Sequence, residues 1–559
     1  MARVTGSHLI CKALKLEGVR NIFALAGDHI LPVLDVMSDQ DFRIIDTRHE
    51  QAAVHMADAW SRITEQPGIC MYTTPGFANA IPGLTNAMHT EGAVISIAGC
   101  ADMHDLGRGA QQEIDQVGMA EPMCKGSFMV NNVRRIPEFI ACAIRLAFSG
   151  RRGPVHLTIP IDVQEQSVEE NDIVFTKPEE YRPKASAQAD PELVREAIAL
   201  LRQAQRPLAV AGTAAGYTLS GDALRRFIET TRVPVVTEEQ SRGLVSDDHP
   251  CVFGFFERGL NRAAAKIRDA DVVVLLGRKQ DFVIGFCRPP NVAADAKIIQ
   301  IDPSPLEIGR NRGVAVGMVG DVTSVLDQLT KEAANYSWKD LPWLDELRAA
   351  RAAQATWTES LARPETPMHA LFVHKTVQSI LRPDDCLVFD GGDFCHFGRS
   401  LLPALKPKHW LYVSSLGMLG SSLPTALAAK VAYPDSRVIM LTGDGAFGFN
   451  GMEFDTAVRH KLNIVAILGN DAAWGIDRQI QLGLYGRPVA TDLLQTRYDQ
   501  MVQGLGGYGE FVERPEDLAP ALQRALAAGQ PALLNVAVQR AISPRAEAAI
   551  GRRKATAHT

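Results

Sequence analysis

The chain has 559 residues, of which 46% are hydrophobic and 22% are charged, and its formal net charge is −6. That length exceeds what one hydrophobic core organises, so three or four domains are expected. The composition is typical of a globular protein, and the negative charge argues against general binding to nucleic acid or to membrane surfaces.

The cysteines and the N-terminus indicate the compartment. Nine cysteines are scattered without CxxC pairs or metal-type spacing, and their odd number argues against a full disulfide set. The first residues lack an apolar core with a cleavage site, and Thr5 is expected to cap an amphipathic helix. No apolar run approaches the roughly 18 residues of a membrane span. The sequence therefore predicts a cytoplasmic, reducing setting without a membrane anchor.

Residues 1–165 are predicted to form a first α/β domain. A strand over residues 21–25 and another over residues 43–46 alternate with helical patterns, and the second strand leads directly to Glu50 and an Ala-rich helix. Taken alone, Glu50 is an acid at a helix N-terminus, where the helix dipole favours negative charge.

Three further segments of this domain carry polar groups. The turn after the first strand contains Asp28 and His29. A strand that starts at Cys70 is expected to end in a Pro-Gly loop with Gly76 and Asn79. An unusually polar run contains Gln111, and it is either a solvated loop or a segment that faces a ligand.

The middle of the chain is predicted to hold a second α/β domain. Residues 166–188 are polar and contain proline, which is typical of a linker, and residues 189–330 follow as the domain. Asp302 ends a predicted strand, where it could bind a ribose hydroxyl, although the fingerprint G-x-G-x-x-G is absent. A purely structural domain is the alternative. Residues 331–365 are expected to form a helical linker.

Residues 366–537 are predicted to form a third α/β domain. Asp393 and Phe394 follow its first strand, and a Gly-rich turn that contains Gly417 and Leu419 precedes a helix. The tail, residues 538–559, is basic, so it is either a solvated, frayed end or a lid that binds an anionic substrate. Its cations are Arg540, Arg545, Arg552, Arg553 and Lys554.

Two consecutive strands of the third domain end in potential metal ligands. One, over residues 438–442, breaks into Gly443-Asp444-Gly445, and the next, over residues 464–468, ends at Gly469-Asn470-Asp471. Parallel strands joined by a helix bring both residues to one edge of the sheet, and glycine lets the backbone approach an anion. A carboxylate, an amide oxygen and diphosphate oxygens suit Mg²⁺. The sequence therefore predicts a diphosphate held through magnesium.

The spacing of Asp444 and Asn470, 26 residues (470 − 444), resembles the diphosphate motif of thiamine-diphosphate (ThDP) enzymes. With Glu50, the GRRGPV segment at 150–155, Asp302 and Leu419, the chain resembles the acetolactate synthase, benzaldehyde lyase and 2-hydroxyacyl-CoA lyase group over nearly its whole length. The resemblance implies three doubly wound α/β domains with mainly parallel sheets. These would be the pyrimidine-binding domain (1–165), the middle domain (189–330) and the diphosphate-binding domain (366–537).

The resemblance also implies roles for individual residues. Glu50 would hydrogen-bond the pyrimidine ring of ThDP and promote loss of the thiazolium C2 proton. Leu419 would separate the two rings, the Gly417 carbonyl would hold the 4′-amino group, and the Ala472 carbonyl would be the third Mg²⁺ ligand beside Asp444 and Asn470. Other implied cofactor contacts are Gly76, Asn79, Asp393, Phe394, Gly445 and Ala446.

The implied activity is a carbon–carbon lyase or carboligase acting on acyloins or 2-hydroxyacyl-CoA esters. Asp477, Asp28, His29 and Gln111 are the candidates for moving protons, although Asp477 could equally be a solvated helix acid. A 2-keto acid decarboxylase or acetolactate-type synthase is the alternative enzyme, and a catalytically silent subunit is the alternative outside catalysis.

Assembly and a further cofactor also follow from the resemblance. Relatives are dimers or tetramers in which Glu50 would come from the neighbouring subunit, and some hold ADP or FAD in the middle domain. Within the group, the segments at 44–50, 113–120 and 451–456 are similar to those of benzaldehyde lyases. Val413 and Asp28 depart from that pattern, since a histidine and a small residue are expected there.

Overall fold

The computed structural model describes residues 3–182 and 186–556, and it divides into two compact units. The first unit holds residues 3–182 with Ser414–Pro434 and Asn450–Leu462. The second unit holds the rest of the described chain and contains two separate sheets. No helix among the described residues combines the length and the apolar character needed to cross a membrane.

The first unit is built on a six-stranded parallel sheet in the order β3-β2-β4-β5-β7-β6. Its central strands are buried along their whole length, which explains their continuous apolar runs. The strands are Asn21–Ala24 (β2), Arg43–Asp46 (β3), Gly68–Tyr72 (β4), Val94–Cys100 (β5), Gly126–Met129 (β6) and Val155–Pro160 (β7).

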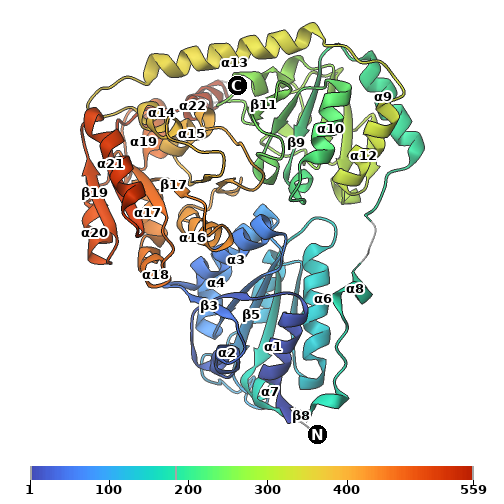
Figure 1. The fold of residues 1–559 in the computed structure, drawn as a ribbon, viewed down its shortest axis with the longest axis vertical. Helices are drawn as coiled ribbons and strands as arrows, with labels where there is room; N and C mark the ends of the chain where they lie inside the picture. Colours follow the sequence, from blue (N-terminus) through green and yellow to red (C-terminus); the bar gives the residue numbers. More distant parts are fainter. Residues whose placement is uncertain (1–2, 183–185, 557–559) are drawn as a thin grey trace. The chain divides into compact units, whose positions relative to one another are not determined.

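Helices cover both faces of this sheet. One face packs against α1, α2, α6 and α7 through a shared apolar core, and α1 lies beside α6 (Figure 1). The Ala-rich α3 packs against α4, β4 and α16, because its small side chains let three neighbours approach closely. The helices are Gly6–Leu16 (α1), Leu31–Ser38 (α2), Glu50–Thr64 (α3), Thr74–Thr90 (α4), Gln116–Ala120 (α5), Ile136–Phe148 (α6), Ile161–Glu165 (α7), Pro178–Tyr181 (α8), Ser422–Ala432 (α16) and Glu453–Arg459 (α18).

The segment predicted as the first linker begins as regular structure. Ser167–Glu169 (β8) pairs antiparallel with Arg3–Thr5 (β1), and α8 follows before residue 183. Residues 166–182 therefore belong to the first compact unit, because pairing with β1 ties them to the start of the chain, whereas residues 186–188 belong to the second.

The middle sheet has the order β11-β10-β9-β12-β13-β14, all parallel. In order of appearance this is 3-2-1-4-5-6, the order of dinucleotide-binding folds. Helices α9, α10 and α12 share one core with the sheet, and α11 and α13, the long yellow helix of Figure 1, share the other. The elements are Pro207–Ala211 (β9), Val235–Thr237 (β10), Val252–Phe255 (β11), Val272–Leu276 (β12), Lys297–Asp302 (β13), Val316–Val319 (β14), Pro191–Gln203 (α9), Asp222–Thr231 (α10), Arg262–Ala265 (α11), Val322–Ala333 (α12) and Pro342–Leu361 (α13).

The third sheet has the order β16-β15-β17-β18-β20-β19, all parallel, and it repeats the strand order of the first. Helices α14, α15 and α21 contribute to its core. The strands are Cys386–Phe389 (β15), Trp410–Tyr412 (β16), Val438–Gly443 (β17), Val465–Asn470 (β18), Tyr508–Val512 (β19) and Ala532–Ala537 (β20). The helices are Ala370–Gln378 (α14), Asp393–Leu401 (α15), Asp444–Asn450 (α17), Gly475–Tyr485 (α19), Tyr498–Gly504 (α20), Pro515–Ala527 (α21) and Pro544–Thr556 (α22). The fold class predicted from the sequence, three α/β domains with parallel sheets, is confirmed.

Candidate active site

Glu50 is the first residue of α3 and is only 7% exposed. Its Oε2 accepts a hydrogen bond from Asn79 Nδ2 at 3.0 Å. A Cβ at Gly76 would lie 2.7 Å from Glu50 Oε1, so only glycine leaves room for this carboxylate. The sequence predicted a Pro-Gly loop here, and that prediction is wrong: Gly76 and Asn79 lie in the first turns of α4, whose proline occupies an early position that tolerates the missing N–H.

His29 lies in a buried polar group of the same unit. Its Nδ1 is 2.9 Å from Thr73 Oγ1 and 3.3 Å from Thr74 Oγ1. Burial lowers the pKa of His29, although the neighbouring Asp28 and Asp102 oppose this effect. His29 is therefore held neutral, whereas Asp28 is exposed.

Gln116, not Gln111, joins this polar group. Gln116 Nε2 donates to Thr74 Oγ1 at 2.9 Å and to the Gly99 carbonyl at 3.0 Å, and the side chain is 2% exposed. Gln111 is exposed on the preceding loop. The polar run in the sequence pointed to this region, but the helical turn that buries Gln116 gave no sequence signal that separated the two glutamines.

The Gly-rich turn before α16 belongs to the first compact unit. Gly417 has φ 76°, a conformation that other residues rarely adopt, and Leu419 beside it is half-buried. Ser414 Oγ donates to Asn86 Oδ1 at 3.0 Å, which ties the start of the turn to α4. The positive φ of Gly417 and the contact with α4 therefore fix the shape of the turn that contains the predicted ring contacts, Gly417 and Leu419.

Asp444 and Asn470 lie at neighbouring strand ends in the second unit, because β17 pairs with β18 with Gly443 opposite Gly469. Asn470 Nδ2 donates to the Thr496 carbonyl (3.1 Å) and to Asn535 Oδ1 (3.0 Å), which fixes the orientation of the amide. Asn470 Oδ1 accepts the Ala472 N–H at 3.2 Å. Among the described residues, nothing donates a hydrogen bond to buried Asp444 Oδ2.

The donor set fits a hard divalent cation. Burial raises the pKa of Asp444 to about 7, and the adjacent Asp471 carboxylate raises it further. Burial also raises the pKa of Asp471. A buried carboxylate (Asp444) beside a second, half-buried one (Asp471) is costly to keep charged without a cation. Mg²⁺ prefers carboxylate and amide oxygens of this kind as ligands. Asp444 and Asn470 are therefore suitable magnesium ligands.

The Ala472 carbonyl is shared with the tail. Ala472 has φ 53°, and its oxygen accepts a hydrogen bond from Arg540 Nη2 at 2.8 Å. Arg540 Nε also donates to the Asp471 carbonyl at 2.8 Å. The Leu493 N–H also donates to this oxygen at 2.8 Å, so both of its lone pairs are engaged, and Mg²⁺ would have to replace one of these hydrogen bonds. Arg540 thus holds the turn that follows Asn470, a role that the sequence did not indicate.

Asp393 is the first residue of α15 and is 7% exposed. Burial raises the pKa of Asp393 to about 7. The hydrogen bond to Ser543 lowers this pKa, and the nearby Asp471 carboxylate raises it. His396 Nδ1 lies 3.5 Å from Asp393 Oδ1 and 3.4 Å from Ser543 Oγ. Asp393 is therefore a carboxyl group that can gain or lose a proton near neutral pH. The sequence missed His396 and Ser543, which are 147 residues apart.

Aromatic rings pack tightly around these strand ends. A Cβ at Gly469 would lie 2.2 Å from Phe394 Cδ2, and a Cβ at Gly445 would lie 2.8 Å from the Trp474 ring. Ala446 is 5% exposed in α17. Asp477 lies in the first turn of α19 and is exposed, so this position agrees with either of its two predicted roles.

The basic tail is helical from Pro544 to Thr556. Helix α22 packs on α19, and a Cβ at Gly483 would lie 2.7 Å from Ile550 Cδ1. Arg545 Nη1 is 3.2 Å from His396 Nε2 and 3.8 Å from Glu257 Oε2. The frayed-end interpretation is therefore wrong for residues 544–556, because apolar contacts with α19 support the helix.

The middle domain has its topological switch point between β9 and β12, where such folds bind nucleotides. Gly212 and Gly277 follow these strands, but Arg278 packs against Gly212 and pairs with Glu238 and Asp281. Asp302 is fully buried, and its Oδ1 accepts the Ser304 N–H at 3.0 Å. Asp302 therefore caps a turn.

Family models match most of the chain. The models of the N-terminal, central and C-terminal domains of thiamine pyrophosphate enzymes match residues 4–119, 194–329 and 390–536. Thiamine pyrophosphate is another name for ThDP. The chain belongs to the thiamine pyrophosphate enzyme family, as the sequence resemblance predicted.

Curated relatives in this family have several activities. The chain is 33% identical over 533 residues to the acetolactate synthase large subunit IlvG of Mycobacterium tuberculosis, covering 95% of each chain. It is 32% identical over 547 residues to the oxalyl-CoA decarboxylase of Escherichia coli K12, covering 95% of this chain and 94% of the relative. It is also 32% identical over 578 residues to human 2-hydroxyacyl-CoA lyase 2, covering 96% and 90%.

Proposed function

We propose that this enzyme is a ThDP- and Mg²⁺-dependent carbon–carbon lyase and carboligase for 2-hydroxycarbonyl compounds, with 2-hydroxyacyl-CoA esters as the preferred class. The observation that carries the preference is the helical tail. Helix α22 packs on α19, the next helix in the chain after strand β18 and its last residue, Asn470. It has one acidic residue, Glu547, and four basic ones: Arg545, Arg552, Arg553 and Lys554. A cationic helix suits the phosphates of a CoA ester. Two of the relatives above are named for CoA esters.

The chain's own residues would hold the cofactor and move protons. Asp444, Asn470 and Ala472 would hold the diphosphate through Mg²⁺, and Leu419 and Gly417 would contact the rings. When bound, ThDP supplies an electron sink that lets the bond beside a carbonyl break. Glu50, placed by α3 and hydrogen-bonded to Asn79, would bind the pyrimidine ring nitrogen.

Proton transfer at the substrate would use other groups. Asp393, with a pKa of about 7, can act as acid or base near neutral pH. His29, kept neutral by burial, can donate or accept a hydrogen bond without carrying charge. Asp477 stays a proposed proton carrier from the first turn of α19, whereas exposed Gln111 and Asp28 are weaker candidates than Gln116.

Product analysis by mass spectrometry tests the activity. Protein loaded with ThDP and Mg²⁺ would receive a short 2-hydroxyacyl-CoA, and formyl-CoA plus an aldehyde or ketone is the expected result. Glu50→Gln should bind ThDP yet lose about 10²- to 10⁴-fold in turnover, the usual contribution of a proton-transferring group. Release of CO₂ from 2-keto acids, with CoA esters left intact, would instead favour the decarboxylase or acetolactate-synthase alternative.

The tail provides a sharper test of the substrate class. A variant with Arg552, Arg553 and Lys554 changed to Ala should raise KM for the CoA ester about tenfold, since each exposed ion pair contributes about 0.5 kcal/mol. Its KM for an uncharged acyloin should not change. An equal effect on both substrates would contradict the CoA assignment.

Assembly and the middle domain complete the proposal. The resemblance favours a dimer or tetramer in which Glu50 of one subunit serves the diphosphate site of another. Co-expressed Glu50→Gln and Asp444→Ala chains should then recover activity that neither variant has alone.

A bound ADP or FAD would be released by acid precipitation and seen in the absorption spectrum. Its absence would leave the middle domain with a structural role.

A further inference from the structure

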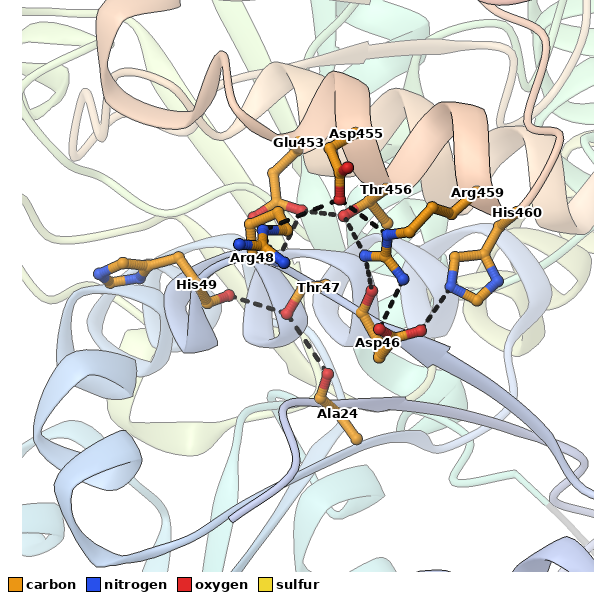
Figure 2. Close-up of polar contacts among 10 residues, drawn as sticks. All are labelled: Ala24, Asp46, Thr47, Arg48, His49, Glu453, Asp455, Thr456, Arg459 and His460. Carbon is orange, nitrogen blue, oxygen red and sulfur yellow. Dashed lines mark hydrogen bonds and ion pairs between the residues drawn. The ribbon is translucent and has the colours of Figure 1, made fainter. Parts of the chain in front are cut away.

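The segment from Asp46 to His49, which leads into α3, is bound on one side by α18 and by His460, the residue after it. Figure 2 shows these contacts, all within the first compact unit. The side chains of α18 point toward the backbone that ends β3. The contacts join parts of the chain that lie more than 400 residues apart, 405 in the case of Arg48 and Glu453.

Glu453 is the buried charged residue of this group, at 1% exposed. Both its carboxylate oxygens accept the Arg48 N–H, at 3.0 and 3.1 Å, and Thr456 Oγ1 donates to Oε2 at 2.6 Å. Burial raises the pKa of Glu453, while the hydrogen bonds from Thr456 and from the Arg48 and His49 backbone oppose that rise. A charged group so buried is costly unless hydrogen-bonded, so the Arg48–His49 backbone is held firmly.

The outer contacts are more exposed. Arg459 Nη2 donates to the Asp46 carbonyl at 2.8 Å, and His460 Nε2 lies 2.8 Å from Asp46 Oδ1. Exposed ion pairs contribute little, whereas a buried, hydrogen-bonded carboxylate is expensive to disturb. Glu453 is therefore the contact that matters most for the geometry of this turn.

We propose that Glu453 is a positioning residue for Glu50. Glu50 follows Arg48 by two residues, and His49 between them caps α3 through the Gln51 N–H at 3.1 Å. By fixing the Arg48 N–H, Glu453 sets the turn from which the Glu50 side chain projects. The inference rests on the proposed role of Glu50 toward ThDP.

The position of Glu453 in the chain gives this contact a second consequence. Glu453 lies nine residues after Asp444 (453 − 444) and before Asn470, within the stretch bounded by the two diphosphate residues. The same short stretch therefore carries a magnesium ligand and the residue that positions the activating glutamate.

The test compares Glu453→Ala, Glu453→Gln and Glu50→Gln with the wild type. The matched control is Asp321→Ala, which removes another carboxylate that caps a backbone N–H, that of Ser324 at 2.9 Å, in the middle domain. Three quantities are measured: the exchange rate of the C2 proton of bound ThDP by NMR after acid quench, ThDP affinity by calorimetry, and amide exchange of residues 46–56 by mass spectrometry on cofactor-free protein.

Glu453→Ala is expected to slow C2-proton exchange about 10²-fold, because a misplacement of about 1 Å at a reacting group has that effect. Faster amide exchange over residues 46–56 should accompany it. Glu453→Gln should slow C2 exchange less than Glu453→Ala, since its amide oxygen still accepts one N–H, and it remains informative if the alanine variant fails to fold. Asp321→Ala should lower stability without changing either exchange rate.

The outcomes separate the two proposals. If Glu50→Gln slows C2 exchange but folded Glu453 variants match the wild type, the positioning role is wrong. If Glu50→Gln itself leaves C2 exchange unchanged, the proposed role of Glu50 fails first. If Asp321→Ala slows C2 exchange as much as Glu453→Ala, the effect is one of general destabilisation and the positioning role is again overturned.

Discussion

At the scale of single residues, the Glu50 carboxylate requires a glycine at position 76. A Cβ at this position would meet Glu50 Oε1 at 2.7 Å, Glu50 Cγ at 2.9 Å and Tyr72 Cβ at 3.0 Å. The first two contacts belong to the side chain that the proposed chemistry needs. A side chain at position 76 must therefore displace Glu50 or strain the start of α4.

Gly76→Ala is expected to lower turnover at least about tenfold, because the displaced Glu50 no longer meets its target in the required geometry. Steady-state kinetics at saturating ThDP measure this effect. Gly504→Ala is the matched control, since a Cβ there meets nothing within 4 Å. The control should be stabilised by about 0.5 kcal/mol and keep full turnover, because alanine reduces the entropy of the unfolded chain. Full turnover in Gly76→Ala would contradict the tight fit.

The raised pKa of Asp393 should make the free energy of unfolding depend on pH. Its folded pKa of about 7 lies above the unfolded value near 3.9, so the folded state binds the proton more tightly between these pH values. Its contribution to stability is present at low pH and is lost as pH rises toward about 7. Asp393→Asn should therefore stabilise cofactor-free protein more at pH 8 than at pH 5. Urea unfolding at both pH values measures this, and equal effects at both would show that the carboxyl is not desolvated.

At the scale of elements, the contact between α19 and α22 decides whether the basic tail is ordered. Gly483 on α19 lies against Ile550 on α22, with Ile550 Cδ1 2.7 Å from a Cβ built at position 483. A glycine in a helix interior is otherwise unfavourable. The close approach of the two helices accounts for it.

Gly483→Val should separate α22 from α19 and expose the tail to trypsin. Faster cleavage at Arg545, Arg552 or Arg553 and a higher KM for CoA esters are expected. Gly551→Ala is the control on α22 itself, because nothing lies within 4 Å of a Cβ there, and it should slow cleavage by favouring the helix. Unchanged proteolysis in Gly483→Val would mean that the packing on α19 does not hold the tail.

At the scale of the whole molecule, buried neutral histidines make folding sensitive to acid. Burial lowers the pKa of His55 and His374 to about 4 and that of His156 to about 3. The unfolded chain binds these protons from about pH 6.5 downward, so the folded state loses stability as pH falls from 6.5 toward 4.

Each such histidine should add roughly 1 kcal/mol per pH unit to the slope of unfolding free energy against pH in this window. His156 lies between Ser96 Oγ (2.8 Å) and Thr158 Oγ1 (2.9 Å), so His156→Gln keeps a polar group there. The variant should show a shallower slope between pH 4.5 and 6.5 in urea titrations. Carboxylates titrate in both proteins, so the difference in slope isolates the histidine, and identical slopes would contradict its burial in neutral form.

The sequence alone determined the family, the α/β class and the pairing of Asp444 with Asn470. These follow from local patterns: apolar strands, glycine at strand ends and the rule that neighbouring parallel strands end at one edge. The position of Glu50 at the start of a helix was also predicted from a local pattern, a strand followed directly by an Ala-rich helix.

Only the tertiary structure decided which polar groups meet across long separations in the chain. Gln116 rather than Gln111 contacts Thr74, His396 lies beside Ser543, and Glu453 holds the Arg48 backbone. No periodicity encodes these contacts, because each depends on how separate helices pack against a strand end. The basic charge of the tail did not predict a helix there, and the packing of α22 on α19 supports that helix. Helix packing depends on many weak contacts over the whole domain. It therefore decides which of the residues that the sequence motifs point to come into contact.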